Sequence, residues 1–125
     1  MKIQESAENY LETILMLKQK NGFVRSIDIA NELCFSKASV SVAMKSLREN
    51  GYVTVDADGG ISLTETGQGI ADTMYERHEV IAGVLMSLGV DKEIAYEDSC
   101  KIEHVISTQT FKKIKEYVEK LAKDK

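Results

Sequence analysis

Three residues that can bind a transition metal lie within five positions near the end of this 125-residue sequence. They are Cys100, Glu103 and His104, in the stretch CKIEH. A thiolate, a carboxylate and an imidazole together suit Fe²⁺, Mn²⁺, Co²⁺, Ni²⁺ or Zn²⁺ better than Mg²⁺ or Ca²⁺, which prefer oxygen ligands. Polar residues at this spacing are also ordinary on a solvated helix face. The residues alone therefore leave a metal site and a wet helix face as two open interpretations.

The helix expected to carry this stretch begins after Asp91 and runs to about Ile106. At 100° per residue, the three candidate ligands lie within roughly 100° of one another around its axis. The apolar residues of this helix lie on its opposite side, at Ile94, Ala95, Ile102, Val105 and Ile106. The candidate ligands therefore face away from the helix's own apolar side, and they need either another element or water as a neighbour.

Two other expected helices carry residues of the same chemical kind. In the helix expected over residues 3–20, Asn9 and Glu12 share a face that lies opposite the apolar stripe. His78 lies on the apolar seam of a helix expected over residues 64–88. A histidine on such a seam is more often a core residue than a ligand, so both roles stay open for His78 from the sequence alone.

The N-terminal part has the element order of a winged helix-turn-helix. Helical spacing of apolar residues predicts a short helix capped by Ser26 and a second helix that starts at Ser36. Alternating apolar residues on both sides of the turn sequence DADGG then predict a β-hairpin, with Val53 and Val55 before the turn and Ile61 and Leu63 after it. In this pattern the second helix of the pair enters the DNA major groove, and the hairpin is the wing.

The second helix of this pair has a small, polar and basic outer face. Residues 20–52 hold five Lys or Arg against three acidic residues, a local excess of two positive charges in a chain of net charge −4. We expect its early residues to approach base edges and its later ones to meet phosphates, in the order Ser36, Lys37, Ser39, Ser41, Lys45 and Arg48. A winged helix used for protein contact is the alternative.

Composition narrows the class of protein further. Hydrophobic residues make up 43% and charged residues 29%, which is typical of a globular chain. The two cysteines, Cys34 and Cys100, form neither a CxxC pair nor a disulfide framework. No signal peptide and no long apolar run are found, so we expect a cytoplasmic protein without a membrane partner.

Several stretches resemble the diphtheria-toxin-repressor family of metal-dependent repressors, and within it the manganese transport regulator branch. They are AENYLETILML, SIDIANEL, SVSVAMKSLRENGYV, LTETGQGIA, YERHEV and CKIEHVIS. The resemblance implies a mainly α fold, with a winged helix-turn-helix DNA-binding domain over residues 1–70. It implies a helical dimerisation and metal-binding domain over residues 71–125, in the two-domain form without an SH3-like domain.

The resemblance also implies a set of metal ligands. The family's positions fall on Asn9, Glu12, His78, Cys100, Glu103 and His104. The cysteine at position 100 resembles the residue type of the iron-responsive branch, whereas Glu12 and His78 resemble the residue types of the manganese branch. Asn9 departs from both branches, which have Asp or Met there. The iron branch's ancillary site would need ligands at Ala82 and Tyr96, so we expect that site to be absent.

By this resemblance, the chain is expected to be a homodimeric repressor of metal-ion uptake genes rather than an enzyme. Mn(II) or Fe(II) would bridge the first helix and the dimerisation domain, and Zn, Co or Ni could replace these metals in vitro. The DNA partner would be a palindromic double-stranded operator. Three alternatives come from other classes: a redox or ligand sensor acting through Cys100, an enzyme with Cys100 as nucleophile and His104 as base, and an adaptor module. The sequence shows neither an oxyanion loop nor an orienting acid, which disfavours the enzyme alternative.

Overall fold

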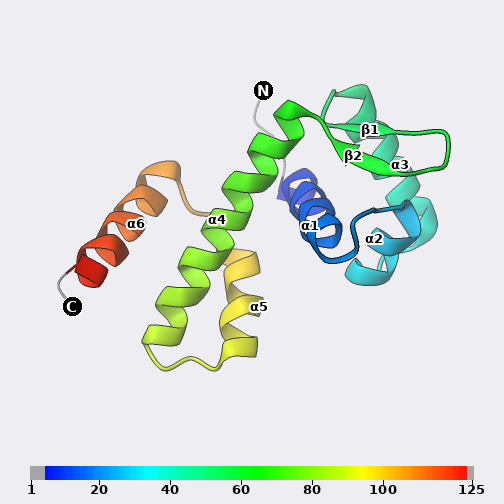
Figure 1. Ribbon diagram of the computed structural model, residues 1–125. Helices are drawn as coiled ribbons and strands as arrows, with labels where there is room; N and C mark the ends of the chain where they lie inside the picture. Colours follow the sequence, from blue (N-terminus) through cyan, green and yellow to red (C-terminus); the bar gives the residue numbers. More distant parts are fainter. Residues whose placement is uncertain (1–4, 124–125) are drawn as a thin grey trace. The chain divides into compact units, whose positions relative to one another are not determined.

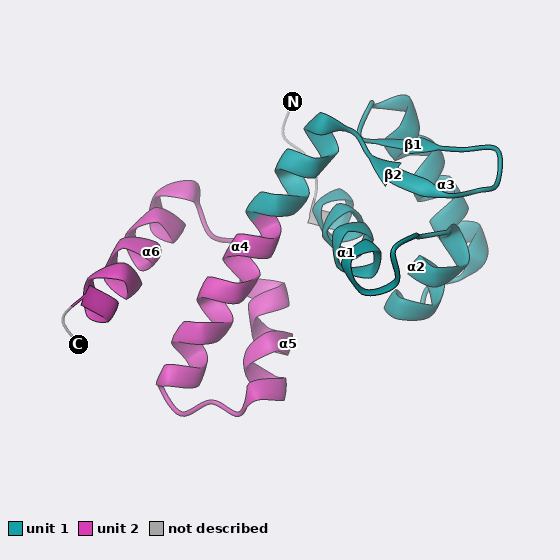
Figure 2. Cartoon of the chain, viewed as in Figure 1, with its two compact units in different colours: residues 1–73 teal, residues 74–125 magenta. Residues whose placement is uncertain are grey.

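The computed structural model describes residues 5–123, which form helices and one small sheet (Figure 1). The elements are α1 (Glu5–Asn21), α2 (Ser26–Leu33), α3 (Lys37–Glu49), β1 (Val53–Val55), β2 (Ile61–Leu63), α4 (Glu65–Ser87), α5 (Lys92–Ile102) and α6 (Thr108–Lys123). Ile3, in the apolar stripe predicted for the first helix, lies outside the described residues. The chain divides into two compact units, unit 1 (residues 1–73) and unit 2 (residues 74–125), and the division falls within α4 (Figure 2).

Unit 1 contains three helices and the hairpin. Helix α1 contacts α2 and β2, while α3 contacts α2 and β1. Leu11, Ile14 and Ile29 are fully buried, and so are Val24 and Val40. The main-chain N–H of Ile61 donates to the carbonyl of Val24 at 2.7 Å, which ties β2 to the segment between α1 and α2. These elements confirm the mainly α, winged helix-turn-helix fold predicted from the sequence.

The predicted wing is a two-stranded antiparallel sheet in which Val53 pairs with Leu63 and Val55 with Ile61. The Asp56 carboxylate holds the turn, because its Oδ1 accepts hydrogen bonds from the N–H groups of Asp58 at 2.9 Å and Gly60 at 2.8 Å. The Asp side chain thus supplies the acceptor that a tight turn needs.

The starts of α2 and α3 are capped in different ways. The Ser36 Oγ accepts a hydrogen bond from the Ser39 N–H at 3.1 Å, as predicted for the start of α3. The prediction that Ser26 caps α2 is wrong, because Ser26 is already helical and Arg25 is the N-cap residue. The N–H of Arg25 donates to the Asp28 carboxylate at 2.9 Å, so Asp28 satisfies the helix start from three residues further on.

The start of α4 packs closely against the entry to the wing. Thr64 Oγ1 accepts from the Gly67 N–H at 3.1 Å and donates to the carbonyl oxygen of Gly51 at 2.7 Å. A Cβ atom at Gly67 would overlap the carbonyl oxygen of Tyr52. Glycine at position 67 is therefore required by close backbone approach within unit 1.

In unit 2, α4, α5 and α6 surround a small core that contains Met74, Ile81, Ala82, Ala95 and Phe111. Helix α5 ends at Ile102, earlier than the predicted end near Ile106. Glu103 is its C-cap residue and His104 lies in the following turn, so CKIEH is part helix and part turn. The predicted apolar side of α5 is also not a buried face throughout, because Ile94 is 50% exposed and Val105, beyond the helix, is 71% exposed.

Candidate metal centre and DNA-binding surface

The carboxylate of Glu103 lies between two imidazole rings in unit 2. His78 Nδ1 is 3.0 Å from one carboxylate oxygen, Oε2, and His104 Nε2 is 3.3 Å from the other, Oε1. Glu103 is fully buried and His78 is 7% exposed. A buried carboxylate needs nearby positive charge or hydrogen-bond donors to stay ionised. Glu103 is therefore part of an internal polar cluster, and the interpretation of this stretch as a wet helix face is wrong.

A second contact fixes α5 against α4 next to this cluster. The Ser99 hydroxyl is fully buried and donates a hydrogen bond to the carbonyl oxygen of His78 at 2.6 Å. Cys100, the next residue on α5, is half-buried. The last turn of α5 thus holds a thiol, a hydroxyl bound to α4 and, at the C-cap, the Glu103 carboxylate.

The aromatic ring of Tyr96 lies beside the cluster, with its centroid 5.2 Å from that of His78. The Tyr96 hydroxyl donates to the Glu79 carboxylate at 3.1 Å. This hydrogen bond, together with burial and the charge of Glu79, raises the pKa of Tyr96 above its ordinary value. Ala82, the other position compared with the ancillary site of the iron branch, is fully buried and offers no ligand atom.

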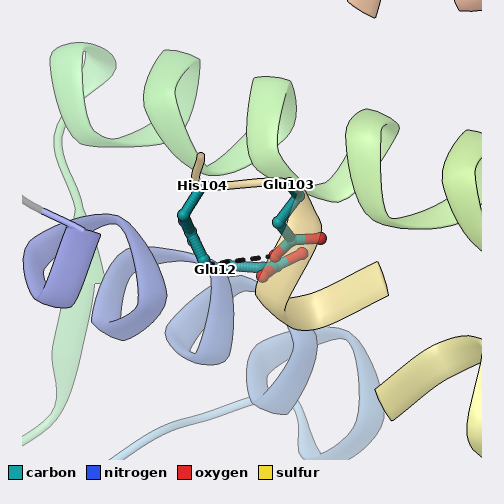
Figure 3. A group of neighbouring side chains, drawn as sticks. All are labelled: Glu12, Glu103 and His104. Atoms are coloured by element: carbon teal, nitrogen blue, oxygen red, sulfur yellow. Dashed lines mark ion pairs between the residues drawn. The ribbon is translucent and has the colours of Figure 1, made fainter. Parts of the chain in front are cut away.

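Unit 1 contributes two of the predicted ligands, both on α1. Glu12 is 3% exposed and Asn9 is half-buried. The carbonyl oxygen of Asn9 accepts a hydrogen bond from the Thr13 hydroxyl at 2.8 Å. Figure 3 labels Glu12 of α1 and, from unit 2, Glu103 and His104, and each of these side chains carries an atom that can bind a metal. Within unit 2, the Glu103 carboxylate, the two imidazoles and the Cys100 thiol are donors of the kinds that suit a divalent transition metal.

All six residues predicted to face DNA are exposed, on α3 or at its N-cap: Ser36, Lys37, Ser39, Ser41, Lys45 and Arg48. The Ser36 hydroxyl also donates to the Ser39 hydroxyl at 2.9 Å, so both serines take part in the helix start. The sequence-based prediction omits Val42, which is 71% exposed on the same helix. Its positions relative to Ser39 and Lys45, three residues away on each side, could have shown that it faces outward.

The prediction also omits Arg77, which is 8% exposed and makes three hydrogen bonds within unit 2. No spacing signal in the sequence distinguishes Arg77 from a surface residue of α4. Only the contact between α4 and the turn after α5 shows its role.

A winged helix-turn-helix unit and a helical unit with buried metal-type ligands define the class of metal-responsive DNA-binding regulators. The chain belongs to the iron-dependent repressor family. The family's sequence model for the N-terminal DNA-binding domain matches residues 2–61, and its model for the metal-binding and dimerisation domain matches residues 64–125. The protein is thus a metal-dependent transcriptional regulator.

The relatives are also transcriptional regulators. The HTH-type transcriptional regulator MntR of Bacillus subtilis is 33% identical over 119 residues, which cover 95% of this chain and 84% of MntR. An uncharacterised HTH-type transcriptional regulator of Methanocaldococcus jannaschii is 34% identical over 98% of this chain and 99% of its own length. The structure of the manganese regulator SloR is similar with a TM-score of 0.80 and 26% identity, over 95% of this chain and 55% of the SloR chain.

These matches bear on the alternatives from other classes. Neither the family nor these relatives support a redox sensor that acts through Cys100, and the relatives are named as regulators of transcription. Within residues 5–123, no helix has both the length and the apolar character that a membrane span needs.

Proposed function

We propose that this protein represses genes for metal-ion uptake when Mn²⁺ or Fe²⁺ is abundant. The observation that carries this proposal is the buried Glu103 carboxylate with an imidazole at each oxygen. SloR, which is named as a manganese regulator, supports the choice of manganese. The half-buried Cys100 supports iron as the alternative, because thiolates favour softer transition metals than Mn²⁺.

We propose that the ligands of one metal centre are His78, Cys100, Glu103 and His104 from unit 2, with Glu12 and Asn9 from unit 1. A bound divalent ion would supply the positive charge that compensates the carboxylates, and it would join the two units. Glu12 contributes a buried carboxylate, whereas Asn9 offers a neutral amide oxygen, which is a weaker ligand. Residues 1–70 would act as the DNA-binding domain and residues 71–125 as the metal-binding and dimerisation domain.

We propose that α3 enters the major groove. Lys45 and Arg48 would neutralise phosphates, and this part of the affinity would be sensitive to salt. The exposed serines and Lys37 would approach base edges. Val42 would contribute sequence preference, because an exposed apolar side chain on a recognition helix suits the methyl group of thymine.

We propose that unit 2 forms the homodimer contact. Several of its large apolar side chains are exposed in the single chain, including Leu88 at 75%, Ile94 at 50% and Val105 at 71%. An open groove of about 460 Å³ is lined by Val84, Gln109, Thr110, Lys113, Ile114 and Tyr117. A symmetric dimer would present two α3 helices to a palindromic operator, and metal binding would narrow the range of positions that they adopt.

The proposal is tested by replacing Glu103 and measuring metal binding. Glu103→Gln keeps the shape of the side chain and removes its charge, so Mn²⁺ affinity should fall by about two orders of magnitude or more. Glu97→Gln is the matched control, because Glu97 is on the same helix and its side chain is 71% exposed. Mn²⁺ titration by electron paramagnetic resonance measures both. Equal affinities for the two variants would remove Glu103 from the metal centre.

A further inference from the structure

Consecutive residues of α4 bind two different parts of Glu103. His78 contacts its carboxylate, and Arg77 Nη1 donates a hydrogen bond to its main-chain carbonyl oxygen at 2.9 Å. The same Nη1 donates to the carbonyl oxygen of Ile106 at 3.1 Å. Arg77 therefore spans both ends of the turn that follows α5, which is the turn that carries His104.

Two further contacts hold the guanidinium group of Arg77 in this position. Its Nη2 donates to the hydroxyl of Thr108 at 3.4 Å, in the first turn of α6. Its central carbon lies 5.4 Å from the centroid of the Phe111 ring, which is suitable for a cation–π interaction. An arginine stays charged at all relevant pH values, so this buried side chain needs such compensation. The planar fork of donors is thereby directed at the main chain of the turn.

We propose that Arg77 is the positioning residue of the metal centre: it holds the Glu103–Ile106 turn by its main-chain carbonyls and so sets Glu103 and His104 for metal binding. This inference rests on the proposed function, because it takes Glu103 and His104 as ligands. Arg77 would not touch the metal itself. Residues that orient metal ligands typically change metal affinity by about 10–100-fold when they are replaced.

The chemistry of the contacts explains why arginine is needed at this position. A lysine ammonium could keep the charge and donate to main-chain carbonyl oxygens, but it lacks the planar fork with which arginine reaches the turn and Thr108 together. A methionine would keep much of the volume and remove every donor. We therefore expect Arg77→Lys to lie between the native protein and Arg77→Met in metal affinity.

Cobalt binding to the purified full-length chain tests the proposal. The visible absorption of Co²⁺ reports ligand geometry, and its titration gives the affinity of the folded protein. We expect about 10–100-fold weaker Co²⁺ binding and an altered visible spectrum for Arg77→Met. The control is Ile81→Val, which trims a buried residue of α4 that makes none of these hydrogen bonds. It should keep the native spectrum and affinity.

Hydrogen exchange in the metal-free protein provides an independent readout. The N–H of Glu103 donates to the carbonyl of Ser99 and that of Val105 to the carbonyl of Ile102. In Arg77→Met these amides should exchange faster, while amides of unit 1 keep their native rates. A purely structural role would instead give a general loss of protection in unit 2 with unchanged Co²⁺ affinity of the folded fraction, and that result would overturn the inference.

The two proposals fail in different ways. If the native protein takes up no Co²⁺, the proposed metal centre is wrong and the positioning role falls with it. If the native protein and Arg77→Met bind Co²⁺ with equal affinity and equal spectra, only the role of Arg77 is wrong.

Discussion

His78 and Glu103 form a buried polar contact between α4 and the end of α5, with His78 Nδ1 3.0 Å from Glu103 Oε2. They are 25 residues apart in the sequence. The main-chain carbonyl oxygen of His78 accepts a hydrogen bond from the hydroxyl of Ser99. The main-chain carbonyl oxygen of Glu103 accepts a hydrogen bond from the guanidinium group of Arg77. His78 and Glu103, two of the proposed ligands, are therefore held by main-chain hydrogen bonds that lie within unit 2.

Ser99→Ala should destabilise unit 2. The Ser99 hydroxyl is fully buried, and its removal leaves the carbonyl of His78 without this hydrogen bond. We expect a loss of about 1–3 kcal/mol in the free energy of unfolding. Ser87→Ala is the control, because the Ser87 hydroxyl donates to the carbonyl of Val84 at an exposed position. Urea denaturation of the metal-free variants measures both, and equal losses would contradict this role for Ser99.

Two glycines near the start of α4 should respond to alanine in opposite directions. Gly67→Ala places a Cβ atom against the Tyr52 carbonyl oxygen, so the free energy of unfolding should fall by about 1–3 kcal/mol. Gly69→Ala meets no atom within 4 Å and removes a flexible residue from a helix. It should therefore stabilise the protein by about 0.5–1 kcal/mol. Thermal unfolding of both variants is the measurement, and stabilisation by Gly67→Ala would show that α4 does not pack closely on Tyr52.

The helices and the wing could be predicted because their signals are local. Apolar spacing marked α1 through α3, and the alternation around DADGG marked the hairpin. The end of α5 could not be predicted, because Ile106 continues the apolar period beyond the point where the helix stops at Ile102. The carbonyls of Glu103 and Ile106 are bound instead by Arg77, which is distant in the sequence.

For the candidate site too, the residue types could be predicted from the sequence but their burial could not. Residue types and family resemblance were sufficient to propose Glu12, His78, Glu103 and the other ligands. The burial of Glu12 and Glu103 was not predictable, because the helical pattern of the sequence places both residues opposite the apolar side. For Glu103, burial goes with contacts to α4, which is distant in the sequence, and no periodicity in one helix encodes such contacts.

Asn9→Asp should strengthen metal binding. The substitution replaces a neutral amide oxygen with a charged carboxylate at nearly constant size, and carboxylates are the stronger ligands for Mn²⁺. We expect Mn²⁺ affinity to rise by about tenfold, which corresponds to about 1.4 kcal/mol. Isothermal titration calorimetry with Mn²⁺ compares the variant with the native chain. An unchanged affinity would indicate that residue 9 lies outside the metal's coordination sphere.

Val42 and Lys45 should affect DNA binding in different ways. Replacing Lys45 with Met should weaken binding to all sequences and lower the slope of log affinity against log salt by about one. Replacing Val42 with Ser should weaken binding only to duplexes that have a thymine at the contacted position. Uracil in place of that thymine removes the methyl group. It should therefore abolish the difference in DNA affinity between the native protein and Val42→Ser.

Fluorescence anisotropy of labelled DNA measures these effects at several salt concentrations, with duplexes first selected from a random pool by the Mn²⁺-treated protein. If Val42→Ser lowers affinity equally for thymine and uracil duplexes, Val42 does not read the methyl group. If the salt slope is unchanged in Lys45→Met, this lysine contacts no phosphate.

Operator affinity with and without metal tests the central claim most directly. The full-length chain is titrated onto its selected duplex under anaerobic conditions, once with Mn²⁺ and once with a chelator, and the same is done with Fe²⁺. We predict that metal tightens binding by an order of magnitude or more in the native protein, and that Glu103→Gln loses this gain while Glu97→Gln keeps it. Equal affinity of the native protein with and without either metal would contradict the account.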